Sequence, residues 1–179
     1  SGSGTISANG TPGGGTTGGG GSGGRIAIYY QNATGFNFAN VSTFGVIGPN
    51  ATVAGSGTVY LQGPTRENGE LVADNNNLAA PSLSSPILGA SGATLALTNF
   101  RVRRGARAKL DSTLSLAGTL DISGGEFAAG NRILADTTTL ASNAVLTHLA
   151  TTATTTFKMD LNVRTLSVDS TSRIDVSGL

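Results

Sequence analysis

Apolar and polar residues alternate with a period of two along most of the chain, in short segments bounded by glycine, asparagine, aspartate and serine. This alternation is typical of β-strands with one buried face. The clearest segments are residues 25–30, 58–61, 94–97, 113–116, 157–161 and 165–168. A helical period is nearly absent, because the one window that shows it, residues 140–149, lacks convincing capping residues. The pattern therefore predicts an all-β protein.

Several of these segments also resemble one another. The form Thr-Leu-small-aliphatic recurs at residues 94–97, 113–116 and 165–168, and Asp-x-Ser-Gly ends a segment at 121–124 and 175–178. Leu95 and Leu114 are nineteen residues apart, and Leu114 and Leu134 are twenty apart. A period near twenty residues that contains short strands and turns is the signature of a solenoid.

We therefore expect a single-stranded parallel β-helix, or β-solenoid, of right-handed sense. Coils stacked about 4.8 Å apart would pair each strand with its neighbours above and below. Glycine and asparagine tolerate the left-handed backbone of sharp corners, which makes residues 74–77 a predicted corner. The alternative is an antiparallel β-sandwich or jelly roll. Asn68-Gly69, a favourable hairpin turn, supports that alternative.

The N-terminal part of the chain differs in composition from the remainder. Twelve of the first 24 residues are glycine, so residues 1–24 read as a flexible linker or a protruding loop. Residues 25–179 are predicted to form the solenoid domain, irregular over 25–90 and with regular coils over 91–179. The chain stops within a pattern, which suggests a piece of a longer protein.

Charge and composition limit the classes of function that fit the chain. Charged residues make up 12%, the net charge is +1 and cysteine is absent. A disulfide framework and thiolate metal sites are therefore excluded. Nothing in this charge balance favours nucleic acid, and no apolar run is long enough to cross a membrane. A surface made of threonine, serine, asparagine and glycine is typical of secreted and cell-surface β-proteins, so we expect an extracellular or cell-surface location.

Three segments carry a family resemblance. Residues 18–30 run Gly-Gly-Gly-Gly-Ser-Gly-Gly-Arg-Ile-Ala-Ile-Tyr-Tyr, and Gly-Ser-Gly-Thr-Val-Tyr-Leu and Asn-Gly-Glu-Leu-Val-Ala-Asp-Asn follow at 55–61 and 68–75. This series resembles large, repetitive, secreted bacterial surface proteins, in which glycine-rich tracts punctuate parallel β-helix or filamentous-haemagglutinin-like stretches. The resemblance implies an adhesin, stalk or matrix filament, and it brings no catalytic residues with it.

One cluster of charge stands out as a candidate site. It consists of Arg101, Arg103, Arg104, Arg107 and Lys109. Arg101 and Arg103 should share one strand face, and Arg107 and Lys109 another. The cluster could bind an acidic polysaccharide, lipopolysaccharide or the carboxylates of a neighbouring subunit. Alternatively, it forms a solvated edge that blocks unwanted strand pairing. Few aromatic residues interleave with it, which argues against single-stranded nucleic acid.

The sequence contains few other residues that could form a catalytic or metal site. His148 is the only histidine and reads as a surface position, so neither a zinc set nor a catalytic triad can be assembled around it. Stacked aspartates at turns could bind Ca²⁺, although capping of the turns is the simpler interpretation. These aspartates are Asp111, Asp121, Asp136, Asp160, Asp169 and Asp175.

The sequence thus predicts a structural or adhesive unit without enzymatic activity or cofactor, which assembles end to end with identical or tandem units. The alternative is a polysaccharide-binding or polysaccharide-cleaving β-helix of the tailspike or lyase kind. That alternative requires a groove lined by aromatic residues and paired acids. Tyr29, Tyr30 and Tyr60 are the only tyrosines and tryptophan is absent, which counts against sugar stacking.

Overall fold

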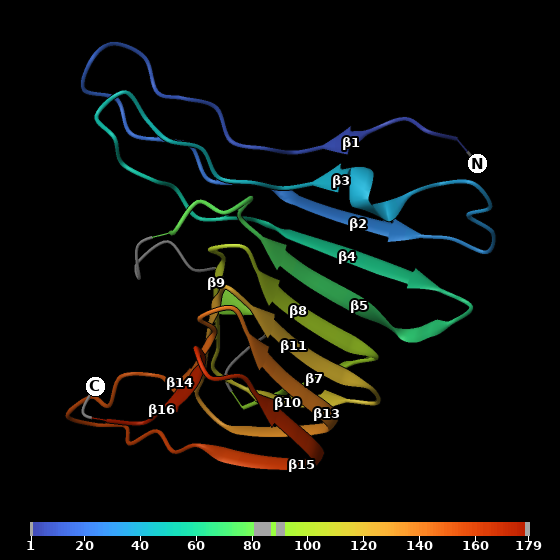
Figure 1. The fold of residues 1–179 in the computed structure, drawn as a ribbon, viewed down its shortest axis with the longest axis vertical. Helices are drawn as coiled ribbons and strands as arrows, with labels where there is room; N and C mark the ends of the chain where they lie inside the picture. The colour runs from blue at the N-terminus through green and yellow to red at the C-terminus, as the bar shows by residue number, and fades with distance from the viewer. Residues whose placement is uncertain (1, 81–86, 89–91, 178–179) are drawn as a thin grey trace.

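The prediction of an all-β protein is confirmed by a computed structural model, which describes residues 2–80, 87–88 and 92–177 (Figure 1). One 3₁₀ turn, η1 (Phe38–Asn40), accompanies the strands. The strands of the first half are β1 (Ile6–Ser7), β2 (Arg25–Tyr29), β3 (Val41–Ser42), β4 (Thr58–Gly63), β5 (Arg66–Asp74), β6 (Ile87–Leu88), β7 (Thr94–Leu97) and β8 (Asn99–Arg103). Those of the second half are β9 (Arg107–Leu110), β10 (Thr113–Leu116), β11 (Thr119–Ser123), β12 (Glu126–Ala129), β13 (Arg132–Ala141), β14 (Val145–His148), β15 (Asp160–Val168) and β16 (Arg173–Asp175).

The strands form three sheets, one of which is strongly curled. The nine-stranded sheet has the order β2-β4-β5-β8-β11-β13-β10-β7, with β15 also paired to β13. It turns back on itself at β13, because the first part of this strand pairs with β10 and the later part with β11. The five-stranded sheet has the order β16-β14-β12-β9-β6, and β1 pairs with β3. Among the described strands, β4 and β5 form the only antiparallel pair.

The pairing register follows a regular spacing. Leu95 pairs with Leu114 and Leu114 with Ile133, so the spacing is nineteen residues at both steps. The predicted partner Leu134 lies one residue further on, opposite Ser115. The next step, from Ile133 to Leu161, is longer, because residues 149–159 form an extended loop before β15.

The repeated sequence segments, by contrast, do not occupy equivalent positions in the fold. Residues 165–168 pair with 137–140, whereas 113–116 lie in the neighbouring part of the sheet, beside β7. Likewise, Asp121 lies in the nine-stranded sheet and Asp175 in the five-stranded one. A segment of alternating aliphatic residues followed by Asp and Ser can form a strand and the turn after it on either sheet, so the repeat does not determine the sheet.

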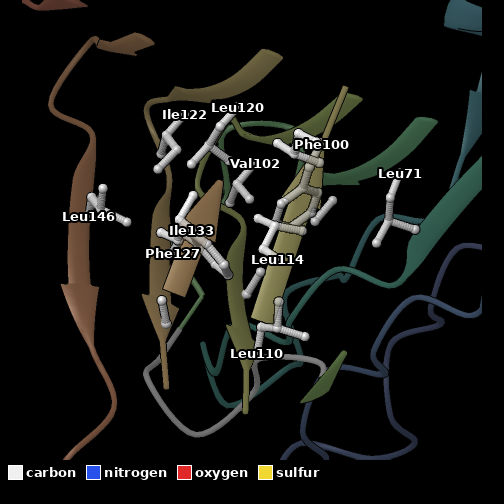
Figure 2. Close-up of a cluster of buried hydrophobic side chains, with 14 of the residues drawn as sticks. Leu71, Phe100, Val102, Leu110, Leu114, Leu120, Ile122, Phe127, Ile133 and Leu146 are labelled. Carbon is white, nitrogen blue, oxygen red and sulfur yellow. The ribbon is translucent and has the colours of Figure 1, made fainter. Parts of the chain in front are cut away.

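The main core lies between the curled sheet and the five-stranded sheet (Figure 2). Leucine, isoleucine and phenylalanine side chains from both sheets are fully buried there. Phe100 and Phe127 meet edge to face with their ring centroids 5.2 Å apart. The other buried side chains of this core include Leu110, Leu114, Leu120, Ile122 and Ile133. Burial of such side chains contributes about 1.5–3 kcal/mol each.

A second core covers the outer face of the sheet. Val59, Leu61 and Val72 point away from the main core and pack with Val41 and with the partly buried Phe38. The segment that carries η1 and β3 therefore crosses over β4 and β5, which are consequently buried on both faces.

The glycine-rich tract lies against the rest of the N-terminal half. Gly10 donates its N–H to Phe44 O at 2.9 Å, Gly23 to Gly55 O at 3.1 Å, and Thr58 to Gly24 O at 3.2 Å. The backbones approach so closely that a Cβ on Gly57 would overlap the carbonyl oxygen of Gly24. The tract is thus held by backbone hydrogen bonds, while its division from the following domain at residue 24 stays a prediction.

Two predicted turns have different outcomes. The corner at 74–77 is confirmed, with φ of 51° at Asn76 and 65° at Asn77. Asn68-Gly69 is wrong as a hairpin turn, because it lies inside β5 and the chain reverses at Pro64-Thr65. Gly69, with φ of 78°, instead lies near a register shift between β4 and β5. With a single antiparallel strand pair, the described sheets do not form the antiparallel sandwich.

Candidate functional site

The main candidate site is a groove of about 440 Å³ on the outer face of β4, β5 and β8. The segment 38–44 forms its other wall. Apolar residues of the second core line one side, and the side chains of Arg66, Glu70, Asp74, Arg101, Arg103 and Arg104 line the other.

Glu70 is the first of two buried acids in this groove, and its residue is only 3% exposed. Arg66 Nε lies 2.5 Å from its Oε2, and Arg101 Nε lies 2.8 Å from its Oε1. Arg101 comes within reach because β8 pairs with β5 in a register that places Arg101 beside Val72. One buried carboxylate is therefore flanked by two guanidinium groups.

Asp74 is the second buried acid, and two arginines contact it as well. Arg103 donates from Nε to its Oδ2 at 2.9 Å, and Arg104 donates from Nε to Oδ1 at 2.9 Å and from Nη2 to Oδ2 at 2.6 Å. The N–H of Asn76 donates to Oδ1 as well, at 2.9 Å. Loss of one arginine would therefore leave each acid with another cation beside it.

Aromatic rings complete the wall formed by segment 38–44. The Arg66 guanidinium lies 5.5 Å from the centroid of the Phe38 ring, and that of Arg104 lies 5.6 Å from the Phe44 ring. Each cation–π contact of this kind contributes roughly 0.5–1 kcal/mol when partly exposed. These contacts join the crossing segment to β5 and to the end of β8.

The groove carries a net positive charge. Its four arginines and two carboxylates sum to +2 at neutral pH. The side chains of Arg101 and Arg103 are 41% and 36% exposed. The Arg103 guanidinium uses its Nε for Asp74, and among the described residues its Nη groups donate no hydrogen bond. Guanidinium groups with spare donors bind carboxylate or phosphate oxygens in a fork geometry.

The predicted basic cluster is split by the structure. Arg101, Arg103 and Arg104 line the groove, whereas Arg107 and Lys109 lie on β9 in the five-stranded sheet. Arg107 pairs there with Glu126 at 3.1 Å.

Sequence reasoning missed Arg66, Glu70 and Asp74. The signal that could have found the acids is their spacing of four residues, which places both on one face of a strand. Arg66 lies four residues before Glu70 on the same strand. The other partners could not be identified in the same way, because they come from β8 and from the residue that follows it.

The interpretation of His148 as a surface position is wrong, because this residue is 8% exposed. It ends β14, which lies between β12 and β16. Its Nδ1 lies 2.7 Å from Leu149 O and its Nε2 3.3 Å from Val176 O. Thus it lies between backbone carbonyl groups, away from the basic groove.

Four of the six predicted aspartates, Asp136, Asp160, Asp169 and Asp175, cap turns or pair with arginines. A hydrogen bond from Arg164 lowers the pKa of Asp136. The pKa of Asp169 is held far below its usual range, first by the N–H of Ser142 and then by hydroxyl groups of its own turn. Asp160 pairs with Arg132 at 2.6 Å.

Within residues 2–80, 87–88 and 92–177, no three acidic or histidine side chains come close enough to hold a metal ion.

No helix in the described part of the chain has the length and apolar character needed to cross a bilayer. Comparison of the chain with models of known protein families, with curated proteins and with solved structures finds no match.

Proposed function

We propose that the protein is a non-catalytic structural or adhesive unit of an extracellular bacterial surface or matrix polymer, and that residues 94–175 form the coils of a parallel β-solenoid. The order in which the chain visits its sheets supports this proposal. Each pass runs along the two parts of the curled sheet and then along the five-stranded sheet, as β7, β8 and β9 do and as β10, β11 and β12 do again. Chains that cross between parallel strands do so almost always in the right-handed sense.

The observation that carries end-to-end assembly is the apolar surface beside β15 and β16. Among the described strands, β15 pairs only with β13 and β16 only with β14. Leu166 is 48% exposed and Val168 is 41% exposed, although their partners Thr138 and Leu140 are buried. The exposed side chains thus continue columns that are buried in the preceding strands.

We infer that a second copy of this unit covers that surface. Unpaired strand edges favour the addition of another strand. The apolar side chains next to those edges, which include Ile174 and Val176, would be buried by the same contact.

A charged pair at this surface should therefore prevent assembly. The double variant Leu166→Lys and Val168→Lys is expected to weaken self-association by more than about tenfold, because two ammonium groups would have to be desolvated. Sedimentation velocity over a concentration series measures the effect, and negative-stain microscopy shows whether rods form. Ile47→Lys is the matched control, since Ile47 is 48% exposed at a different place. Wild-type protein that stays monomeric at every concentration would contradict the assembly proposal.

A second candidate function, the binding of an acidic polysaccharide, is favoured by the net charge of the groove. Replacement of both Arg101 and Arg103 by glutamine should weaken binding of polygalacturonate about tenfold or more. The fold should persist, because Arg66 stays beside Glu70 and Arg104 beside Asp74. Affinity electrophoresis or calorimetry at low salt measures the change.

The chain offers a matched control for this experiment. Replacement of Arg107 and Lys109 by glutamine removes the same charge from a different sheet. Equal loss of binding in both double variants would show that net charge, and not the groove, attracts the polymer.

A further inference from the structure

A second hollow, of about 520 Å³, lies where β2 and the β4–β5 hairpin end. It is separate from the lining of the basic groove and has a different character. Its walls are formed by Tyr29, Tyr30, Gln31, Gln62, Gly63, Pro64 and Glu67. Aromatic rings, amides and one carboxylate thus meet at one end of the sheet.

Two of the three tyrosine rings near this hollow have a structural explanation. The Tyr30 ring lies against Gly63, where a Cβ would overlap it, and its hydroxyl accepts a hydrogen bond from Arg66 Nη1 at 2.6 Å. The Tyr60 ring covers Gly69 in the same way. Aromatic rings that cover strand glycines are a known way to stabilise a sheet.

Tyr29 has no comparable explanation. It lies on β2, is 70% exposed, and is the most exposed of the large apolar side chains in the described part of the chain. Its ring is nevertheless supported from one side, because the Tyr60 ring lies 5.7 Å away at an angle of 57°. Tyr60 is itself held by its hydroxyl, whose single proton is shared between Gln62 Oε1 at 3.2 Å and Asn68 O at 3.3 Å. A supported tyrosine offers contact area at a low entropic cost.

We propose that Tyr29 is the stacking platform of a binding site for a neutral sugar ring. A pyranose has an apolar face of C–H groups, which packs on an aromatic ring, and a rim of hydroxyl groups that need both donors and acceptors. Gln31, Gln62 and Glu67 supply amide and carboxylate groups around the platform. Gln62 is held in place, because its Nε2 donates to Glu67 O at 2.8 Å. A few polar groups that converge beside aromatic rings are typical of small-ligand sites.

The charge of the hollow selects the class of sugar. Glu67 is the only ionisable group of its lining besides the two tyrosines. A carboxylate beside the platform repels uronic acids and sulfated sugars but accepts hydrogen bonds from hydroxyl groups. The site is thus expected to take neutral hexoses or N-acetylhexosamines. This inference depends neither on the assembly proposal nor on the basic groove.

The test is calorimetric titration of the full chain with cellohexaose, maltohexaose and chitohexaose, and with an acidic oligogalacturonate for comparison. At least one neutral oligosaccharide should bind, and Tyr29→Ala should weaken its binding about tenfold or more. Tyr29→Phe keeps the ring and should bind within about threefold of the wild type. Arg25→Ala, an exposed change on the same strand, should have no effect.

Three results would overturn the inference. These are no heat of binding with any neutral oligosaccharide at millimolar concentration, unchanged binding by Tyr29→Ala, and tighter binding of the acidic oligosaccharide than of every neutral one. The double glutamine variant of Arg101 and Arg103 should retain the neutral ligand, which separates this site from the groove.

Discussion

Replacement of Gly57 by alanine is expected to destabilise the protein by about 3 kcal/mol or more, at the upper end of the usual cost of overpacking. The added methyl group would overlap the carbonyl oxygen of Gly24 and lie close to that of Gly23, at 2.7 Å. Both obstacles are backbone atoms, so no side chain can rotate away to make room. The hydrogen bond from Gly57 N to Thr43 O would be displaced as well.

Urea denaturation followed by circular dichroism measures this loss, and Gly14→Ala is the matched control. Gly14 belongs to the glycine-rich tract that Gly57 approaches at Gly24, but a Cβ on Gly14 meets no atom within 4 Å. Its replacement should leave the free energy of unfolding unchanged or raise it slightly, because alanine restricts the unfolded chain. Two variants that unfold within about 0.5 kcal/mol of each other would contradict the close packing of the tract.

Replacement of Asn75 by alanine should cost about as much, for a different reason. Asn75 is fully buried. Its Oδ1 accepts from Gly45 N at 2.8 Å, and its Nδ2 donates to Ala54 O at 3.0 Å and to Leu78 O at 2.7 Å. The variant would leave these three backbone groups without their partner. One buried, unsatisfied group costs about 1–3 kcal/mol, so a total of about 3 kcal/mol or more is expected.

Thermal unfolding measures the loss in Asn75→Ala, and hydrogen exchange at the Gly45 amide reports on the site itself. Asn131→Ala is the control, because Asn131 is exposed and its side chain accepts only from the adjacent Arg132 N–H among the described residues. Protection of the Gly45 amide that is the same in wild type and Asn75→Ala would show that the side chain does not hold this segment.

Much of the strand pattern could be predicted from the sequence. Period-two alternation identified β7, β10 and the later part of β15, whereas the predicted segment 157–161 is strand only from Asp160. The pairing of Leu95 with Leu114 follows the spacing of the leucines. These features are local or recur along the chain, so the sequence contains evidence for them at several positions.

Contacts that are made once, between distant segments, could not be predicted in this way. The crossing of residues 36–46 over β4 and β5 depends on apolar residues on both faces of these strands, which alternation alone does not reveal. Apart from Arg66, which lies on β5 itself, the partners of Glu70 and Asp74 come from β8 and from Arg104 directly after it. Glycine composition indicated flexibility for residues 1–24, whereas Gly24 of this tract lies so close to Gly57 that a Cβ on Gly57 would overlap its carbonyl oxygen.

The single antiparallel pair has a consequence for any assembly of these units. β2 runs parallel to β4, β4 runs against β5, and β5 has the direction of β8, β11, β13 and β15. The two outermost strands along this path, β2 and β15, therefore have opposite polarity. Copies related by simple translation that joined β15 to β2 would meet in an antiparallel seam. Each unit would then contribute two antiparallel junctions to the stack, this seam and its own β4–β5 pair.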